Sequence, residues 1–219
     1  MLEDDHDGEF RYDHRAVGAA QALDPDHVAY LGTASKSLAP AVGLAWAVVP
    51  QRMISGLAEA RRVAGVAADA VSQLALADFI ESHRYDRHVR RLRAEYRRRR
   101  ELLDGLMVAS GSGARVRGLA AGLHCVVELP AGVAADAVVA EAARREVAVE
   151  GLAAYAAHAT AAARTSTIVV GYGAPPARVA DEAIAELVAA IASVAPPRSL
   201  AARGRLLPNF CSMTSPPIA

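Results

Sequence analysis

The chain has almost no lysine. Lys36 is the single lysine among 24 Lys and Arg residues, so the other cationic side chains are all arginine. A genome whose composition favours arginine over lysine at the protein surface would explain this scarcity. The one remaining lysine would then need no functional role. Arginine, however, replaces lysine only for charge and solubility, because guanidinium stays protonated and does not attack carbonyls. The scarcity therefore makes Lys36 either a chance survivor or a retained nucleophile.

Other scarcities exclude whole classes of protein. No run of about 18 apolar residues occurs, which argues against a membrane-spanning helix, and the acidic start MLEDDHDGEF is unlike a signal peptide. The two cysteines, Cys125 and Cys211, lack metal-ligand spacing and are expected to be free thiols of a cytoplasmic protein. A formal net charge of zero gives no general case for nucleic-acid binding.

One segment departs from this balance. Residues 83–106 contain nine arginines. Val89, Leu92, Tyr96 and Leu103 recur at three- and four-residue steps, which predicts an amphipathic helix. Its basic side could meet phosphates, but a long surface helix with a solvated basic face is the favoured interpretation.

Short β-rich runs alternate with helical patterns, which indicates an α/β fold. The predicted strands are HVAYLG, GLAWAVVP, GLHCVVELP, VAVEGL and STIVVGYG. Helices are predicted near 51–63, 68–82, 134–145 and 176–194, with Pro175 and Pro176 starting the last. ASGSGARVRG is expected to be a turn-rich connection.

The helix after His83 looks like a domain junction. We expect residues 1–83 to form part of a large domain, 84–195 a smaller α/β domain and 196–219 a loose tail. The first residues resemble the end of a strand followed by a turn. That arrangement suggests that an N-terminal portion of the domain is missing.

Two strand ends carry complementary chemistry. LEDD runs into acids, and about thirty residues later AYLG runs into Thr-Ala-Ser-Lys-Ser. α/β sheets bind ligands at the carboxyl ends of their strands, so a carboxylate and Lys36 could converge there. Pyridoxal phosphate needs both groups: an amine for its aldehyde and an acid for its pyridine nitrogen.

Five ordered blocks then give a specific resemblance: EDDHDGEFRYD, LGTASKSLAPAVGLAWAVVP, HVRRLRAEYRRRRELLDGL, AGLHCVVELP and VVGYGAPP. Together they resemble the aminotransferase-like domain of MocR regulators, GntR-family transcription factors fused to a fold type I, class I/II aminotransferase-like domain. The resemblance covers about residues 2–195. It implies the C-terminal half of the fold type I large domain followed by the small domain.

The resemblance also implies roles for residues. Lys36 would be the Schiff-base lysine and Asp4 the partner of the pyridinium nitrogen, with Asp5 as the alternative to Asp4. Ser35, and with it Thr33 or Ser37, would lie near the cofactor phosphate. Arg164 is a weaker candidate for binding a substrate carboxylate.

The chain departs from the family pattern in three respects. His6 replaces a tyrosine that bonds the cofactor ring, although imidazole can donate one hydrogen bond. Residues 41–43, Ala-Val-Gly, stand where the family has a segment with an arginine that binds the phosphate. The loss of such a charged hydrogen bond typically weakens binding by about 1.5 to 3 kcal/mol. The winged helix and the half-domain with the phosphate-binding loop, which the family places first, do not precede Lys36.

Other polar residues have simpler interpretations. His124 is expected to be a core or edge histidine of its strand rather than catalytic. Cys125 is expected to pack, and His158 has no evident partner.

Three functions remain open. The first is a sensor domain of a regulator, which binds an amino acid or amine through the cofactor, dimerises, and reaches DNA only through a winged helix. The second is a pyridoxal-phosphate-dependent transaminase. The third is a catalytically silent remnant, because half of the cofactor pocket would have to come from elsewhere.

Overall fold

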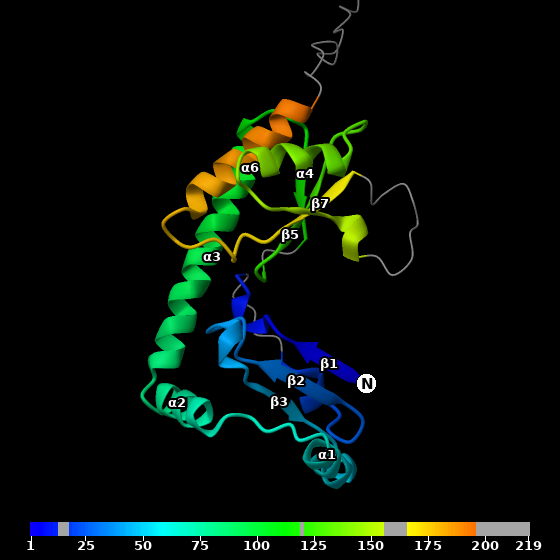
Figure 1. The fold of residues 1–219 in the computed structure, drawn as a ribbon, viewed down its shortest axis with the longest axis vertical. Coiled ribbons are helices and arrows are strands. Elements are labelled where there is room, and N and C mark those ends of the chain that lie inside the picture. Colours follow the sequence, from blue (N-terminus) through cyan, green and yellow to red (C-terminus); the bar gives the residue numbers. More distant parts are fainter. Residues whose placement is uncertain (13–17, 119–120, 156–165, 196–219) are drawn as a thin grey trace, which may run out of the picture.

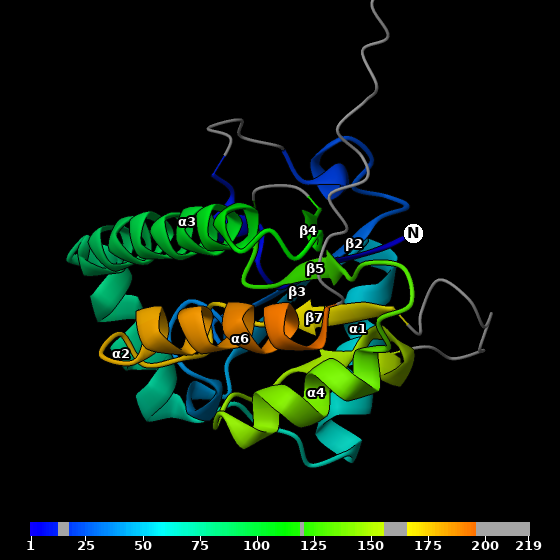
Figure 2. The ribbon, with the colours of Figure 1, turned by 90° about the horizontal axis from the view of Figure 1, so that it is seen from above.

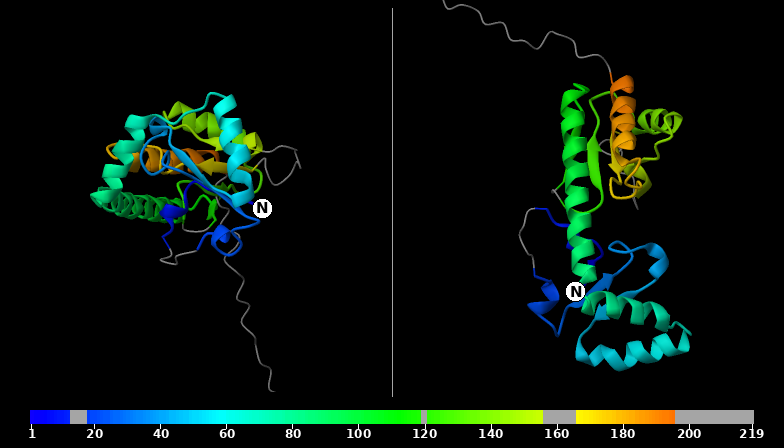
Figure 3. Two further views of the ribbon diagram at one scale, coloured as in Figure 1. Left: turned by 90° about the horizontal axis from the view of Figure 1, so that it is seen from below. Right: turned by 90° about the vertical axis from the view of Figure 1, so that its left-hand side faces the viewer.

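The computed structural model describes residues 1–12, 18–118, 121–155 and 166–195. They form two sheets beside one long helix, α3 (Arg84–Ala109). Figure 1 and the right panel of Figure 3 show α3 running the height of the molecule, with its N-terminal end near the three-stranded sheet and the rest beside the four-stranded sheet. No helix in these described ranges is long and apolar enough to cross a membrane.

The three-stranded sheet contains β1 (Leu2–Asp5), β2 (Ala29–Thr33) and β3 (Ala45–Val48), in that order. β1 and β2 are parallel, with Asp4 opposite Leu31, and β3 pairs with β2 in the antiparallel direction. Because β1 and β2 are parallel, their carboxyl ends lie at the same edge of the sheet. This edge is where the acid block and the Lys36 segment leave their strands.

Two helices follow this sheet, α1 (Gln51–Val63) and α2 (Ala70–Glu81). Asp69 caps α2 by accepting a 2.6 Å hydrogen bond from the Ser72 backbone N–H. Neither helix has a buried residue. The exposed apolar side chains of this part include Trp46, Val48, Ile54, Leu57, Val71, Leu74 and Ile80.

The four-stranded sheet holds the main core. Its order is β4 (Arg115–Arg117), β5 (Cys125–Glu128), β7 (Thr167–Val170) and β6 (Glu150–Gly151), the last followed by the short helix η4 (Leu152–Tyr155). Neighbouring strands are all antiparallel. Helices α3, α4 (Ala135–Arg144) and α6 (Ala180–Val194) pack against it (Figure 2). Fully buried members of this core include Leu103, Val127, Val138, Ile168 and Ile191.

The predicted α/β architecture is confirmed, and most predicted elements appear within a few residues. Three local predictions were wrong. The connection predicted as turns contains β4, the strand predicted at VAVEGL is only Glu150–Gly151, and α6 begins at Ala180 rather than at the prolines. Pro176 instead closes a turn, its carbonyl accepting from the Val179 N–H at 3.0 Å. The predicted division at residue 83 and the tail at 196–219 stay predictions, and the tail lies outside the described residues.

Candidate functional site

Lys36 occupies a single helical turn directly after β2. The Leu38 N–H donates to the Ala34 carbonyl at 2.9 Å, and the Ala34 N–H donates to the Leu44 carbonyl at 3.0 Å. These bonds fix the turn, while the Lys36 side chain is exposed. Within the described ranges its amine has no hydrogen-bond or ion-pair partner. The amine is therefore available to a ligand.

The hydroxyl groups around Lys36 are not equivalent. Ser37 is buried, and its hydroxyl lies 2.9 Å from that of Tyr85 on α3, so it is turned away from the exposed amine. Thr33 and Ser35 are half-buried and bond one another: the Thr33 Oγ1 is 2.9 Å from the Ser35 Oγ and accepts from the Ser35 N–H at 3.1 Å. Ser35 is thus the hydroxyl that remains beside Lys36 at the surface.

The two acids at the end of β1 also differ: one is bonded within the protein and the other is exposed. Asp5 accepts hydrogen bonds from the Tyr30 hydroxyl at 3.0 Å and from the Gly8 N–H at 2.8 Å. It thereby shapes the turn after β1, and a side chain at Gly8 would collide with its carboxylate. Asp4 points to the opposite face of the sheet, is exposed, and has no partner within the described ranges. His6, next in the chain, is also exposed.

The chain then crosses from one sheet to the other. Phe10, the last residue of the short helix η1 (Gly8–Phe10), is fully buried in the core of the four-stranded sheet. Its ring meets that of Tyr96 edge-on at a centroid distance of 5.2 Å. The Phe10 carbonyl accepts from the Gly122 N–H at 2.9 Å. Figure 1 shows this segment rising from β1 towards β5. The acid block is therefore fixed to both sheets.

Two tyrosines close the crossing. The hydroxyls of Tyr12 and Tyr172 both donate to the Gly122 carbonyl, the second at 2.8 Å. Burial, followed by the hydrogen bond to Tyr172, raises the pKa of Tyr12 well above its usual range. Because both phenols are buried and bonded to one carbonyl, they clamp the segment after β1 against the start of β5.

Helix α3 bonds to two segments of the site, the turn after β1 and the Lys36 turn after β2. Arg93 donates to the Glu9 carbonyl through Nε at 2.8 Å and Nη2 at 2.6 Å, and Arg97 donates to the Tyr12 carbonyl at 2.8 Å. On the other turn, His88 Nε2 donates to the Ser37 carbonyl at 2.8 Å. Tyr85 joins the two, since its hydroxyl bonds both Ser37 and the Glu9 carboxylate.

These contacts correct the expectation of a wholly solvated basic helix face. Several arginines of α3 are structural donors to backbone carbonyls rather than free cations, and Arg99 and Arg100 are buried. These roles could not be predicted from the sequence, because the accepting carbonyls lie 73 to 85 residues away. Arg87, Arg90 and Arg91 remain exposed.

The four-stranded sheet contributes His124, which the sequence had suggested to be a core or edge residue. It is exposed and directly precedes β5. The pKa of His124 is nevertheless lowered. Partial burial of the ring is the main cause, followed by the positive charge of Lys36, and His6 lowers it further. Asp7 acts in the opposite direction. Side chains from two other segments of the chain therefore act electrostatically on His124.

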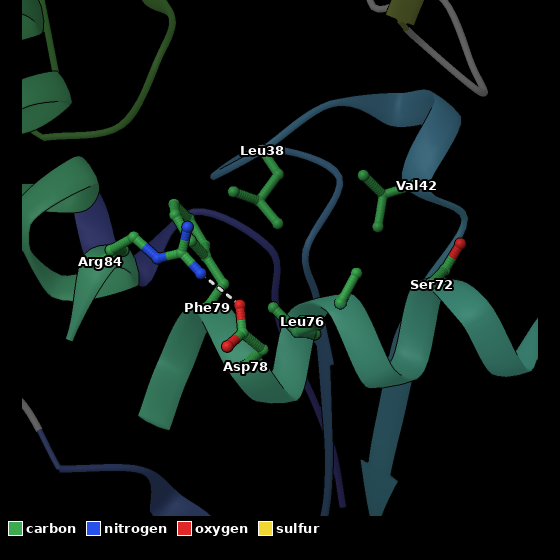
Figure 4. A pocket seen from close by; sticks show the side chains of 8 residues that line it. Leu38, Val42, Ser72, Leu76, Asp78, Phe79 and Arg84 are labelled. Atoms are coloured by element: carbon green, nitrogen blue, oxygen red, sulfur yellow. Dashed lines mark hydrogen bonds and ion pairs between the residues drawn. The ribbon is translucent and has the colours of Figure 1, made fainter. Parts of the chain in front are cut away.

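A pocket next to the Lys36 turn is separate from this site (Figure 4). It has a volume of about 410 Å³ and lies between α2, the Leu38–Val42 loop and the start of α3. Arg84 pairs with Asp78 there and lies over the Phe79 ring at 5.6 Å. Neither Lys36 nor Asp4 lines it, so it is adjacent to the Lys36 turn but not part of the predicted site.

Some predicted residues cannot be placed. Arg164, His158 and Cys211 lie outside the described residues. Cys125 is buried, as expected, and burial raises the pKa of its thiol to about 11. No group of three or more metal-binding side chains occurs in the part of the chain that the structure describes.

The fold resembles that of solved aminotransferases. The α-aminoadipate aminotransferase LysN of Thermus thermophilus superposes with a TM-score of 0.77 at 20% identity, covering 88% of this chain and 50% of that one. A kynurenine aminotransferase of Pyrococcus horikoshii superposes with a TM-score of 0.75 at 24% identity, covering 88% and 47%. The architecture is that of part of a fold type I aminotransferase.

Several sequence relatives are transcriptional regulators. The HTH-type transcriptional regulator YhdI of Bacillus subtilis is 38% identical over 131 residues, which are 59% of this chain and 28% of that protein. The probable rhizopine catabolism regulatory protein MocR of Rhizobium meliloti is 36% identical over 107 residues, 48% of this chain and 22% of that protein. No protein-family model matches the chain. The chain is an aminotransferase-like domain related to part of the MocR-type regulators, and it spans less than a third of their length.

Proposed function

We propose that this chain is a ligand-binding, aminotransferase-like domain of a MocR-type regulator and that Lys36 holds pyridoxal phosphate. One observation carries the proposal: Asp4, near the carboxyl end of β1, and Lys36, just after the carboxyl end of the parallel strand β2, are both exposed and have no partner among the described residues. The fold shared with aminotransferases supports it. A relative of the chain at 32% identity is named as a pyridoxine biosynthesis regulator, PdxR of Corynebacterium glutamicum.

The described residues fit most of such a cofactor. Pyridoxal phosphate supplies an aldehyde that condenses with amines and a pyridine ring that accepts electron density. The Lys36 amine would bond the aldehyde, Asp4 would hold a proton on the ring nitrogen, and His6 would donate to the ring oxygen. Ser35 would meet the phosphate, whereas Asp5 is committed to Tyr30 and Gly8.

The fit is weakest at the phosphate. The loop after Lys36 continues through η3 (Pro40–Val42) to Gly43, whose φ of 60° is left-handed, and it offers no arginine. We therefore propose that cofactor affinity is modest in this chain alone. We propose that Arg164 binds the carboxylate of an amino acid ligand. A second copy of the chain would complete the site, and a winged-helix domain of the full regulator would contact DNA.

The test uses the purified chain, pyridoxal phosphate, borohydride reduction and peptide mapping. We expect a visible absorption band that borohydride removes, because reduction of the imine leaves a stable pyridoxyl group that absorbs in the near ultraviolet and maps to the peptide containing Lys36. Lys36→Arg keeps the positive charge but cannot react with the aldehyde, so it should abolish the band. Asp4→Asn should weaken binding about tenfold through the loss of a charged hydrogen bond.

Two results would redirect the interpretation. A band that persists in Lys36→Arg would show that the cofactor reacts elsewhere, and the proposal would be wrong. No band in either protein would indicate a silent remnant. Steady conversion of an amino acid and a 2-oxoacid by the loaded protein would favour a transaminase over a sensor.

A further inference from the structure

Tyr85, in the first turn of α3, is bonded to both turns of the candidate site. Its hydroxyl lies 2.9 Å from the Ser37 hydroxyl in the Lys36 turn, and it also bonds the Glu9 carboxylate in the turn after β1. A phenol has one proton and a carboxylate only accepts. Tyr85 therefore donates to Glu9 and accepts from the Ser37 hydroxyl, so the three groups form one chain of hydrogen bonds.

Each of the two turns is held by α3 at a second point. The Glu9 carbonyl accepts from Arg93 at 2.6 and 2.8 Å, and the Ser37 carbonyl accepts from His88 Nε2 at 2.8 Å. A residue that is bonded at its side chain and at its carbonyl has little rotational freedom left. Helix α3 thus fixes the orientation of both residues, and Tyr85 is the side chain that joins them.

The surroundings shield these bonds from water. Ser37 is 1% exposed. The Phe79 ring of α2 packs against the Tyr85 ring at a centroid distance of 6.2 Å and against the His88 ring at 6.0 Å. Hydrogen bonds are stronger in such a shielded place, and the cost of breaking one is higher.

The anchored residues lie next to the two free groups. Lys36 directly precedes Ser37 in one helical turn, which the 2.9 Å bond from the Leu38 N–H to the Ala34 carbonyl closes. Glu9 belongs to the turn that follows the acid block of β1. The side chains that α3 holds therefore lie on the segments that carry the exposed amine and the exposed carboxylate.

We infer that Tyr85 is a positioning residue, which sets the place of the Lys36 amine relative to the acid block by holding Ser37 and Glu9 together. This deepens the proposed function and rests on it for the identity of the ligand. Helix α3 also packs in the core of the four-stranded sheet. A ligand that moves the Lys36 turn would therefore move the start of this helix as well.

The test depends on Lys36 being the single lysine. The full chain labelled with ¹⁵N-lysine gives one backbone amide signal by NMR, and this signal reports the conformation of the Lys36 turn without any cofactor. Tyr85→Phe keeps the ring against Phe79 and removes only the hydroxyl. We expect this variant to shift the Lys36 signal.

Glu9 provides the sharper variants, and they carry the test alone if Tyr85→Phe does not fold. Glu9→Ala removes the acceptor and should shift the Lys36 signal, whereas Glu9→Gln keeps an acceptor oxygen and should restore most of the wild-type position. In the Tyr85→Phe background Glu9→Ala should add no further shift, because the chain of bonds is already broken.

Tyr96→Phe is the matched control. Tyr96 lies on the same helix, and its hydroxyl has no hydrogen bond among the described residues. This variant loses the same atom and should leave the Lys36 signal in place. Equal shifts from Tyr85→Phe and Tyr96→Phe, or additive shifts from Tyr85→Phe and Glu9→Ala, would overturn the inference.

A second measurement uses the loaded chain. Tyr85→Phe should still give the Lys36 absorption band but should bind pyridoxal phosphate about fivefold more weakly, and an unchanged affinity would contradict the positioning role. A band on Lys36 with an amide signal that no variant shifts would retain the proposed function and discard the inference. An amide signal that responds as expected, with no band, would support the role of Tyr85 and discard pyridoxal phosphate.

Discussion

Arg99 shows how this chain uses its arginines in the interior. It is 3% exposed and donates to the Glu95 carboxylate at 2.8 Å, to the Tyr172 carbonyl at 3.1 Å and to the Pro175 carbonyl at 2.9 Å. A buried charge is tolerated only when it is bonded on all sides. Arg99 therefore connects α3 to the segment that leads from β7 to α6.

Glu95 is the acid on which this arrangement depends. Hydrogen bonds from Arg98, followed by Arg99, lower the pKa of Glu95 to about 2. A carboxyl whose folded pKa is depressed stabilises the protein above its unfolded pKa, and that stability is lost as the pH falls towards the folded value. We expect Glu95→Gln to cost about 1 to 3 kcal/mol of unfolding free energy at neutral pH.

The measurement is urea unfolding between neutral pH and about pH 3. The wild type should lose stability below about pH 4.5, the usual carboxyl range, and Glu95→Gln should lose less over the same interval. Glu128→Gln is the control, because the Arg117–Glu128 pair is about half exposed on both sides and should contribute at most about 1 kcal/mol. Equal acid sensitivity of Glu95→Gln and wild type would contradict the assignment.

At the residue scale, the sequence could identify groups with distinctive chemistry but not their partners. The lone lysine and the acid block pointed to Lys36 and Asp4. His124 was expected to be a core or edge histidine of its strand, but it is exposed and directly precedes β5, because apolar neighbours in the sequence do not show what lies against the ring. The same holds for Tyr85 and His88, whose partner Ser37 lies about fifty residues earlier.

At the element scale, β2 depends on a glycine. A Cβ at Gly32 would collide with the Trp46 indole, which lies across β2 from its partner position on β3. Gly32→Ala should displace the indole and cost about 1 to 3 kcal/mol by overpacking. Trp46 is the single tryptophan, so its fluorescence spectrum reports the displacement directly.

Gly56→Ala is the matched control for this substitution. Gly56 lies inside α1 with nothing within 4 Å of an added Cβ. Alanine there should stabilise by up to about 1 kcal/mol through helix propensity and leave the tryptophan spectrum unchanged. A Gly32→Ala protein with unaltered emission and stability would show that β2 and β3 tolerate a side chain at this position.

Helices and strands could be predicted where the apolar residues kept one spacing over the whole segment. The apolar steps of α3 and the helical pattern over residues 68–82 are local signals, so α3 and α2 were found. β4 was not, because a strand of three residues, Arg115–Arg117, in a glycine- and serine-rich segment is formed by pairing with β5 rather than by propensity. The delayed start of α6 likewise reflects the turn at Pro176.

At the scale of the whole molecule, burial is uneven. The main core lies around the four-stranded sheet, whereas α1 and α2 bury no residue. The two parts are joined by α3 and by the clamp at Gly122, so the stability of the clamp should decide whether the sheets stay together. Sequence periodicity could not show this, because it reports which face is apolar and not what covers it.

The buried tyrosines, which include the two of the clamp, predict that the folded protein loses stability at alkaline pH. Burial is the main cause that raises the pKa of five of the six tyrosines, to about 12 for Tyr30. A raised folded pKa means that stability is present below the unfolded value near 10 and is lost as the pH rises above it. The five are Tyr12, Tyr30, Tyr85, Tyr96 and Tyr172.

We therefore expect the unfolding free energy to fall steeply above about pH 10, by up to about 1.4 kcal/mol per pH unit for each such tyrosine. Tyr12→Phe should cost about 1 kcal/mol at pH 8 through its lost hydrogen bond and should make the alkaline decline shallower. Urea unfolding across this range, with the tyrosinate absorption followed in parallel, measures both effects. Tyr155→Phe is the control: a hydrogen bond to Glu150 raises the pKa of Tyr155 too, but this side chain is 62% exposed and outside the clamp, so solvent screening should keep its effect on stability small. If its alkaline slope changes as much as that of Tyr12→Phe, the clamp is not the origin of the sensitivity.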